Sequence, residues 1–208
     1  MKFVAISDTH CRHRSLKLPK GDVLLHAGDI SYRGDQREIH DFLDWFGKLP
    51  FTYKVFIAGN HDFFFEKEKD AMIRKIIPAG VTYLKDEELI IEGIKIWGSP
   101  ITPLFYKWAF NKKRGDTLAR HWQNIPDDTH VLLTHGPVHG VLDVLINEQN
   151  AGDKELLERV LLVKPKVHVC GHIHESHGLQ KRYGIKFLNA CVLNESYELV
   201  NKPLIFDL

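Results

Sequence analysis

The chain of 208 residues has only three cysteines, Cys11, Cys170 and Cys191, and they are scattered without a C-x-x-C pair. This pattern argues against a disulfide framework, a thiolate zinc site and a dithiol redox motif. Cys170 and Cys191 lie in apolar runs and are expected to be small core residues. Cys11 follows His10 directly, but we do not expect it to be a ligand, because the donors around it are hard oxygens. A reducing compartment is favoured, and we expect a cytoplasmic protein.

The sequence also lacks an apolar run long enough to cross a bilayer, so no membrane partner is expected. Its 28 basic and 27 acidic side chains give a formal net charge of +1, which argues against nucleic acid as a partner. One basic cluster, residues 111–120, is predicted to be a solvated loop and the start of a helix. Repeats and Pro/Gly/Ser linkers are absent, which predicts a single domain over residues 1–208. The oligomeric state is left open.

Short runs rich in Val, Ile, Leu and Phe are present throughout and alternate with stretches of helical spacing. The apolar runs are residues 2–7, 22–27, 53–58, 130–135 and 166–171, and the helical stretches are residues 35–49, 68–77 and 153–163. Such alternation indicates sheets covered on both faces. Residues 88–100 alternate around Glu92-Gly93 and predict a β-hairpin, and residues 185–193 and 202–208 are further predicted strands. We therefore expect an α/β fold, a four-layer sandwich of two mixed β-sheets flanked by helices.

Each of the buried runs ends in a polar cluster. The clusters are Asp8-Thr9-His10, Asp29, Asn60-His61-Asp62, His135 and His172-Ile173-His174. Ligand sites in α/β sheets lie beyond the carboxyl ends of strands, so these clusters are expected to meet. Side chains two residues apart in an extended segment point to one side, which predicts that His172 and His174 converge on a single point. His26 and His168 stand alone in apolar runs and are expected to be structural.

The assembled side chains predict a metal centre. They are Asp8, His10, Asp29, Asn60, His135, His172 and His174. This number exceeds the three or four ligands of one zinc ion, which predicts two divalent ions with an aspartate between them, one carboxylate oxygen to each. Oxygen and imidazole ligands without thiolate suit Mn²⁺, Fe, Zn²⁺ or Co²⁺. Two such ions clamp a phosphoryl group and generate a hydroxide for in-line attack, which predicts hydrolysis of a phosphate ester.

The ordered series SDTH, AGD, AGNHD, THG and CGHIH, each behind an apolar run, resembles that of the calcineurin-like metallophosphoesterase superfamily. The segments GDVLLHAGDIS, LPFTYKVFIAGNHD and PLIFDL are similar to the branch of metallophosphoesterase domain-containing proteins, which is related to class III cyclic nucleotide phosphodiesterases. The similarity extends from residue 2 to residue 208. It implies the calcineurin-like phosphoesterase fold and metal-dependent catalysis, with Mn²⁺ favoured in vitro.

The resemblance also implies roles for individual residues. Metal 1 would be held by Asp8, His10 and His174, metal 2 by Asn60, His135 and His172, with Asp29 bridging the two. His61 would bind the scissile phosphate together with Asn60 and protonate the leaving group, a role suited to an imidazole near neutral pH. Asp62 either orients His61 or caps the following turn.

Some assignments remain open at this point. His13, Arg14 and His139 either touch substrate or lie in exposed loops, and residues 103–110 form either a pocket wall or, as we favour, core. The expected substrate is a small phosphodiester such as a cyclic nucleotide, or a phosphomonoester. The alternative is a metal-binding scaffold protein with this fold and little catalysis. A nuclease would need a basic groove.

Overall fold

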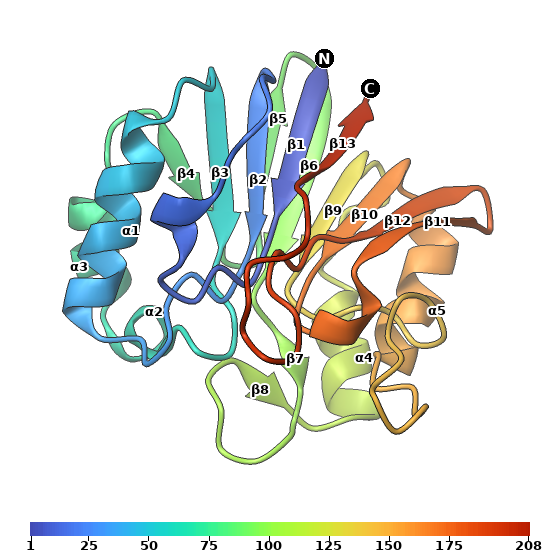
Figure 1. The fold of residues 1–208 in the computed structure, drawn as a ribbon. Helices are drawn as coiled ribbons and strands as arrows, with labels where there is room; N and C mark the ends of the chain where they lie inside the picture. Colours follow the sequence, from blue (N-terminus) through green and yellow to red (C-terminus); the bar gives the residue numbers. More distant parts are fainter.

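A computed structural model describes all residues from 1 to 208 and contains two β-sheets packed face to face (Figure 1). The first sheet has the order β13 (Leu204–Asp207), β1 (Lys2–Ile6), β2 (Val23–Ala27), β3 (Tyr53–Ile57) and β4 (Val81–Tyr83). Strands β1 to β4 are parallel, and β13 pairs with β1 in the antiparallel direction. The first sheet is therefore mixed, as predicted.

The second sheet is mixed as well. Its order is β11 (Gly178–Arg182), β12 (Ile185–Asn189), β10 (Val167–Cys170), β9 (Val131–Thr134), β6 (Ile94–Ser99) and β5 (Glu87–Ile91). The four inner strands are parallel, whereas the two edge strands are antiparallel to their neighbours. A short ladder pairs β7 (Thr102–Pro103) with β8 (Asn111–Lys112). The helix start predicted within residues 111–120 lies at Asp116.

Helices cover the outer face of each sheet (Figure 1). Beside the first sheet lie α1 (Gln36–Lys48), α2 (Phe63–Lys67) and α3 (Asp70–Ile76), and beside the second lie α4 (Asp116–Trp122) and α5 (Lys154–Val163). The ring of Phe42 in α1 packs on Phe56 of β3, and Trp122 in α4 packs on Trp97 of β6. None of the helices combines the length and apolar character needed to cross a bilayer.

The residues of the inner strands are buried on both faces of each sheet. In β1, Phe3 and Ala5 belong to the core between the sheets, whereas Val4 and Ile6 belong to the core under the helices. This alternation follows from the period of two in a strand. It explains why these strands are continuous apolar runs, and the four-layer sandwich predicted from them is confirmed.

The predicted hairpin is formed by β5 and β6. Glu92 and Gly93 at its turn have φ values of 47° and 80°, as a two-residue turn with both central residues left-handed requires. Asp35 accepts hydrogen bonds from the backbone N–H groups of Arg37 and Glu38 and caps α1, which lies within the predicted helical stretch 35–49. A cap of this kind contributes about 1 kcal/mol.

Candidate metal centre

The carboxyl ends of β1, β2, β3, β9 and β10 meet at the lower end of the two sheets in Figure 1, and the predicted polar clusters follow them. Asp8, His10, Asp29 and His172 all adopt positive φ, between 37° and 71°. Such a backbone is costly for residues other than glycine and tends to be retained at functional sites. The chain therefore turns sharply after each strand and directs these side chains to one place.

Asp29 lies at the centre of the cluster and is almost fully buried. Its Oδ2 atom is 3.6 Å from His10 Nε2 and 3.4 Å from His135 Nε2. Its Oδ1 atom accepts a hydrogen bond of 2.8 Å from the backbone N–H of His61. A single oxygen of Asp29, Oδ2, therefore faces both sides of the centre, where one oxygen for each side was expected.

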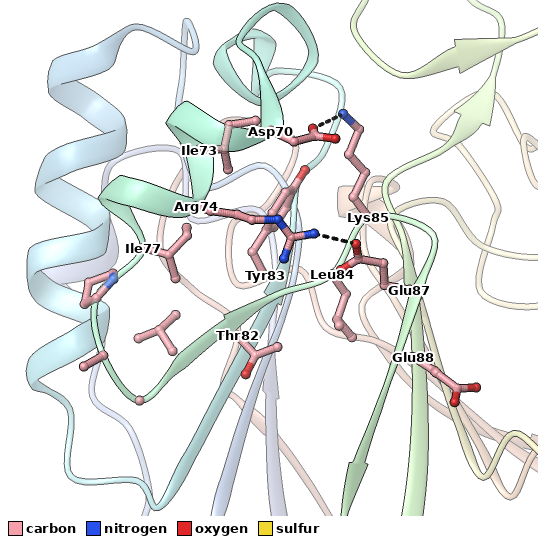
Figure 2. A pocket seen from close by; sticks show the side chains of 14 residues that line it. Asp70, Ile73, Arg74, Ile77, Thr82, Tyr83, Leu84, Lys85, Glu87 and Glu88 are labelled. Atoms are coloured by element: carbon pink, nitrogen blue, oxygen red, sulfur yellow. Dashed lines mark hydrogen bonds and ion pairs between the residues drawn. The ribbon is translucent and has the colours of Figure 1, made fainter.

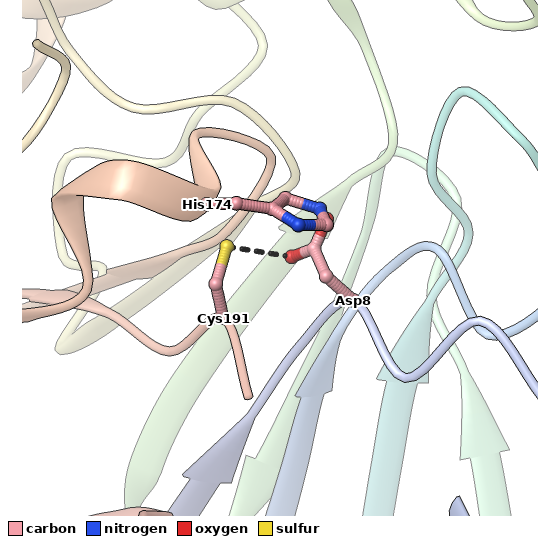
Figure 3. Close-up of side chains that lie close together, drawn as sticks. All are labelled: Asp8, His174 and Cys191. Atoms are coloured by element: carbon pink, nitrogen blue, oxygen red, sulfur yellow. Dashed lines mark hydrogen bonds and ion pairs between the residues drawn. The ribbon is translucent and has the colours of Figure 1, made fainter. Parts of the chain in front are cut away.

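Asp8 faces His174 from the other side (Figure 3) and also lies near His10. Its Oδ1 atom lies 3.4 Å from His174 Nε2 and 3.9 Å from His10 Nε2. Both Asp8 Oδ1 and His10 Nε2 are buried without a hydrogen-bond partner. Buried polar atoms are normally paired, so these two require a ligand between them.

The opposite side of Asp29 carries the remaining three predicted ligands. His135 Nε2 is 2.9 Å from Asn60 Oδ1, and the rings of His135 and His172 are 5.0 Å apart. Ligand atoms of Asp29, His135 and His172 all lie within 4.8 Å of one another. All seven predicted ligands are thus brought together around the two buried carboxylates.

Backbone carbonyl groups fix the orientation of the imidazole rings. The Nδ1 atoms of His10, His135 and His174 bond to the carbonyl oxygens of Ser31, Ala27 and Asn194, at 3.0, 2.8 and 2.9 Å. Each carbonyl can only accept, so each Nδ1 donates and leaves the Nε2 lone pair for a metal. Four ligands at 2.1 Å from a tetrahedral ion lie about 3.4 Å apart. The donor set and its spacing therefore fit divalent metal ions.

Two glycines in the motifs permit this close packing. A Cβ at Gly59 would lie 2.2 Å from Asp29 Oδ1, and one at Gly171 would lie 2.2 Å from Asp8 Oδ2. No other residue could occupy these positions without displacing a carboxylate.

His172 and His174 do not converge as an extended strand would place them. Strand β10 ends at Cys170, His172 has a φ of 71°, and His174 begins a short 3₁₀ helix. The prediction from strand alternation is therefore wrong, because the chain leaves the strand at Gly171. The two rings lie on opposite sides of the centre, His172 with His135 and His174 with Asp8.

The two carboxylates dominate the electrostatics. Burial opposes charge on His135 and His174, but the adjacent Asp29 and Asp8 outweigh it and raise the pKa of each histidine to about 9. Burial lowers the pKa of His10 to about 4 and that of His172 to about 3. The carboxylates thus favour positive charge on His135 and His174, whereas His10 and His172 remain neutral imidazole donors.

His61 borders the metal centre on the solvent side. Its Nδ1 atom is 2.8 Å from the carbonyl oxygen of Tyr32, and its ring packs on Trp108 with centroids 4.2 Å apart. Trp108 and Phe105 line a pocket of about 460 Å³ that opens onto Asn60 and His61. Residues 103–110 were favoured as core, and this was wrong for Phe105 and Trp108, although Ala109 and Phe110 are buried.

Asp62 has neither of the two roles considered for it. Its carboxylate accepts from the backbone N–H groups of Gly59, Ile30 and Ser31, at 2.8, 3.2 and 3.0 Å, and from the Ser31 hydroxyl. It makes no side-chain cap on α2, and His61 Nδ1 is bonded to Tyr32 instead. Burial and then Asp29 raise the pKa of Asp62 to about 6. Asp62 ties the loop after β2 to the loop after β3.

The other residues whose role the sequence left open, His13, Arg14 and His139, lie outside the metal centre. His13 is buried and packs against Trp45 and Phe42, and Arg14 pairs with Asp41 at 2.7 Å, so both serve the contact with α1. The side chain of His139 is 34% exposed and lies 3.8 Å from Asp143.

Buried His26 and His168 bond to the hydroxyls of Thr9 and Thr134, which confirms them as structural. Cys170 and Cys191 are buried as predicted, and half-buried Cys11 joins no ligand group. A contact that the sequence did not reveal is that of Cys191, whose thiol lies 3.0 Å from Asp8 Oδ2.

A second hollow, of about 420 Å³, lies between α3 and strands β4 and β5 (Figure 2). Its charged side chains are engaged in ion pairs: Arg74 with Glu87 at 2.9 Å, Lys85 with Asp70 at 3.2 Å, and Glu88 with Lys95 outside the hollow at 3.1 Å. No ligand group of the metal centre reaches it. The reactive side chains are therefore confined to the strand ends.

Comparisons with known proteins show similarity in sequence and in fold. Residues 1–176 match the family model described as "Calcineurin-like phosphoesterase". The chain is 39% identical to "Metallophosphoesterase domain-containing protein 1" of Homo sapiens, over all of this chain and 71% of that protein. It is also 39% identical to "UPF0046 protein T07D4.2" of Caenorhabditis elegans, over all of this chain and 60% of that one. A crystal structure titled as Phosphopantetheinyl Hydrolase (PptH) from Mycobacterium tuberculosis has a similar fold, with a TM-score of 0.67 at 16% identity over 94% of this chain and 90% of that one.

Proposed function

We propose, from the premise that the chain belongs to the calcineurin-like phosphoesterase family, that it is a metal-dependent phosphohydrolase acting on small phosphodiesters. The superfamily and the branch predicted from the motif series are confirmed. The family supports a metal-dependent phosphoesterase in general. The preference for diesters, cyclic nucleotides among them, over monoesters is the specific part of the proposal.

The observation that carries this proposal is the position of Asp29 Oδ2. It lies 3.6 and 3.4 Å from two Nε2 atoms, those of His10 and His135, whose Nδ1 atoms are both bonded to carbonyls. We assign metal 1 to Asp8, His10 and His174, metal 2 to Asn60, His135 and His172, and the bridge to Asp29. Mn²⁺, Fe, Zn²⁺ or Co²⁺ suit these donors, with Mn²⁺ expected to support activity in vitro. When bound, two such ions supply Lewis acidity toward water and the phosphoryl oxygens.

Asn60 and His61 are the proposed substrate contacts. Asn60 directs its Oδ1 at His135, so its amide N–H groups remain available to a phosphoryl oxygen. His61 bonds to the Tyr32 carbonyl through Nδ1, so Nε2 is the nitrogen left to protonate the departing oxygen. Packing against Trp108 restricts its ring to this orientation.

The proposal extends to the chain as a whole. We propose that residues 1–208 form one domain, because β1 and β13 from the two ends of the chain pair in one sheet. A cytoplasmic place of action is supported by the three free cysteines. Small molecules are the proposed substrates, because Arg114 is the sole basic side chain, apart from histidines, among the residues that line the pocket.

The test begins with the metal content of the purified chain, followed by chelation and an assay with added Mn²⁺. Cyclic nucleotides, acyclic diesters and monoesters are compared at equal concentration, with His139→Ala as a control for a histidine outside the centre. We expect Mn²⁺-dependent turnover that is greatest on diesters. Two bound ions without turnover on any class would instead favour the scaffold alternative. Turnover of DNA or RNA that falls steeply with salt would favour a nuclease.

A further inference from the structure

The segment from Asn189 to Tyr197 lies beyond the residues matched by the family model, yet it contacts one side of the metal centre. The Cys191 thiol bonds to Asp8, and the Asn194 carbonyl accepts from His174 Nδ1. The ring of Tyr197 packs at 5.2 Å from that of His174. All of these contacts are to residues assigned to metal 1.

The two oxygens of Asp8 have opposite surroundings. Oδ2 accepts from the backbone N–H of His172 at 2.9 Å and from the Cys191 thiol at 3.0 Å. Oδ1 is buried, lacks a hydrogen-bond partner and faces His174 Nε2 at 3.4 Å. The donors on Oδ2 thus hold the carboxylate in the rotation that leaves Oδ1 toward His174, where it would be available to a metal ion; Figure 3 shows the donor from Cys191.

Cys191 is itself held rigidly in place. It forms an isolated parallel bridge with Ser7, and its backbone N–H donates to Asn189 Oδ1 at 3.2 Å. The Val192 N–H donates to the Ser7 carbonyl at 3.0 Å. Cys191 is fully buried. Pairing with Ser7, which directly precedes Asp8 in the chain, therefore sets the position of Cys191.

The residues assigned to metal 2 make no hydrogen bond to this segment, and His172 shares with it only Asp8 Oδ2, to which its backbone N–H donates. His135 is oriented by the carbonyl of Ala27 and by Asn60, both within the residues matched by the family model. We propose that Cys191 is a positioning residue that, by donating its S–H to Asp8 Oδ2, strengthens binding of metal 1 and leaves metal 2 unaffected. This inference rests on the two-metal function proposed above.

The test measures Mn²⁺ binding to the chelated full-length chain by titration calorimetry, without any activity assay. Cys191→Val keeps most of the buried volume but removes the donor, Cys191→Ala removes both, and Cys191→Ser retains a donor. We expect two sites in the unmodified chain and a loss of about 10- to 100-fold at one of them in the Val and Ala variants. Cys191→Ser restores most of the affinity. Cys170→Ala is the matched control, a buried thiol on β10 without a hydrogen bond to the centre, and it leaves both sites unchanged.

Several results would overturn the inference. These are equal weakening of both sites, unchanged affinity in Cys191→Val, or binding of fewer than two ions by the unmodified chain. A thiolate-to-cobalt charge-transfer band in the Co²⁺ form that disappears in Cys191→Ser would make Cys191 a ligand instead. Thermal unfolding of each chelated variant checks folding, and Cys191→Val is decisive where Cys191→Ala does not fold. Two bound ions without turnover would refute the proposed catalysis while leaving the Cys191 result intact.

Discussion

Replacing His168 with Leu should reduce the loss of unfolding free energy that occurs as the pH falls below 7. His168 is fully buried, and burial lowers its pKa from 6.5 to about 3. Its Nε2 is 2.7 Å from the Thr134 hydroxyl, whereas its Nδ1 has no hydrogen-bond partner. The folded chain therefore keeps this imidazole neutral at a pH where the unfolded chain protonates it.

The sign and size of the effect follow from linkage. Because the pKa is depressed in the folded state, the stabilisation is complete above 6.5 and is lost as the pH falls from 6.5 toward 3. Between pH 7 and pH 5 this single group should cost about 2 kcal/mol of unfolding free energy. In His168→Leu the Thr134 hydroxyl keeps its bond of 2.7 Å to the Gly136 carbonyl, so no new polar atom is left unpaired.

The assay is urea unfolding of the chelated protein at pH 7 and pH 5, for the unmodified chain and for His168→Leu. All other titrating groups, including buried His26, are present in both and cancel in the difference. We expect the unmodified chain to lose about 2 kcal/mol more than the variant over this range. Identical pH dependence in the two proteins would refute the argument that His168 is neutral when folded.

Three further predictions concern the metal centre. His61→Ala should keep both ions and lose roughly 10² to 10⁴-fold in rate on esters with alkoxide leaving groups. The loss should be much smaller on p-nitrophenyl esters, because p-nitrophenolate departs without being protonated. Equal losses in steady-state kinetics would assign His61 to phosphate binding. Asp29→Asn should lose metal occupancy and rate together, because Oδ2 faces both sides of the centre; elemental analysis showing two ions with full activity would contradict the bridge. Gly171→Ala should lower the metal content, because the Cβ of the alanine would lie 2.2 Å from Asp8 Oδ2. An unchanged metal content would show that the loop can move to accommodate the added methyl group.

The location of the centre could be predicted because it depends on local pattern. Each strand that carries it is a continuous apolar run, and each run ends at a polar cluster, so residues such as Asp8 and Asn60 are placed once the strands are known. The resemblance added the division into two ligand sets, which stays a prediction together with the role of His61. What the pattern could not supply was the backbone after the strands, where His172 lies outside β10 and has a φ of 71° in place of the extended backbone that the prediction assumed.

The other features that the sequence did not predict depend on contacts between residues that are distant in sequence. Cys191 is 183 residues from Asp8, and nothing in its own surroundings distinguishes it from an ordinary core cysteine. Trp108 lies in an aromatic stretch typical of a core and reaches the pocket beside His61 only through tertiary packing. Strand β11 has a mostly exposed, polar sequence, and its pairing with β12 follows from the turn at Tyr183-Gly184, with φ values of 55° and 80°.

The pairing of β13 with β1 places both ends of the chain together. The amino group of Met1 donates to the carbonyl oxygen of Leu208 at 2.6 Å, and Figure 1 shows the two ends at the top of the sheets, opposite the metal centre. Strand β1 runs from this end to Ile6, two residues before Asp8, so its full length separates the termini from the reactive groups. A tether, a reporter domain or a solid support joined at either end would therefore leave the pocket mouth facing open solution.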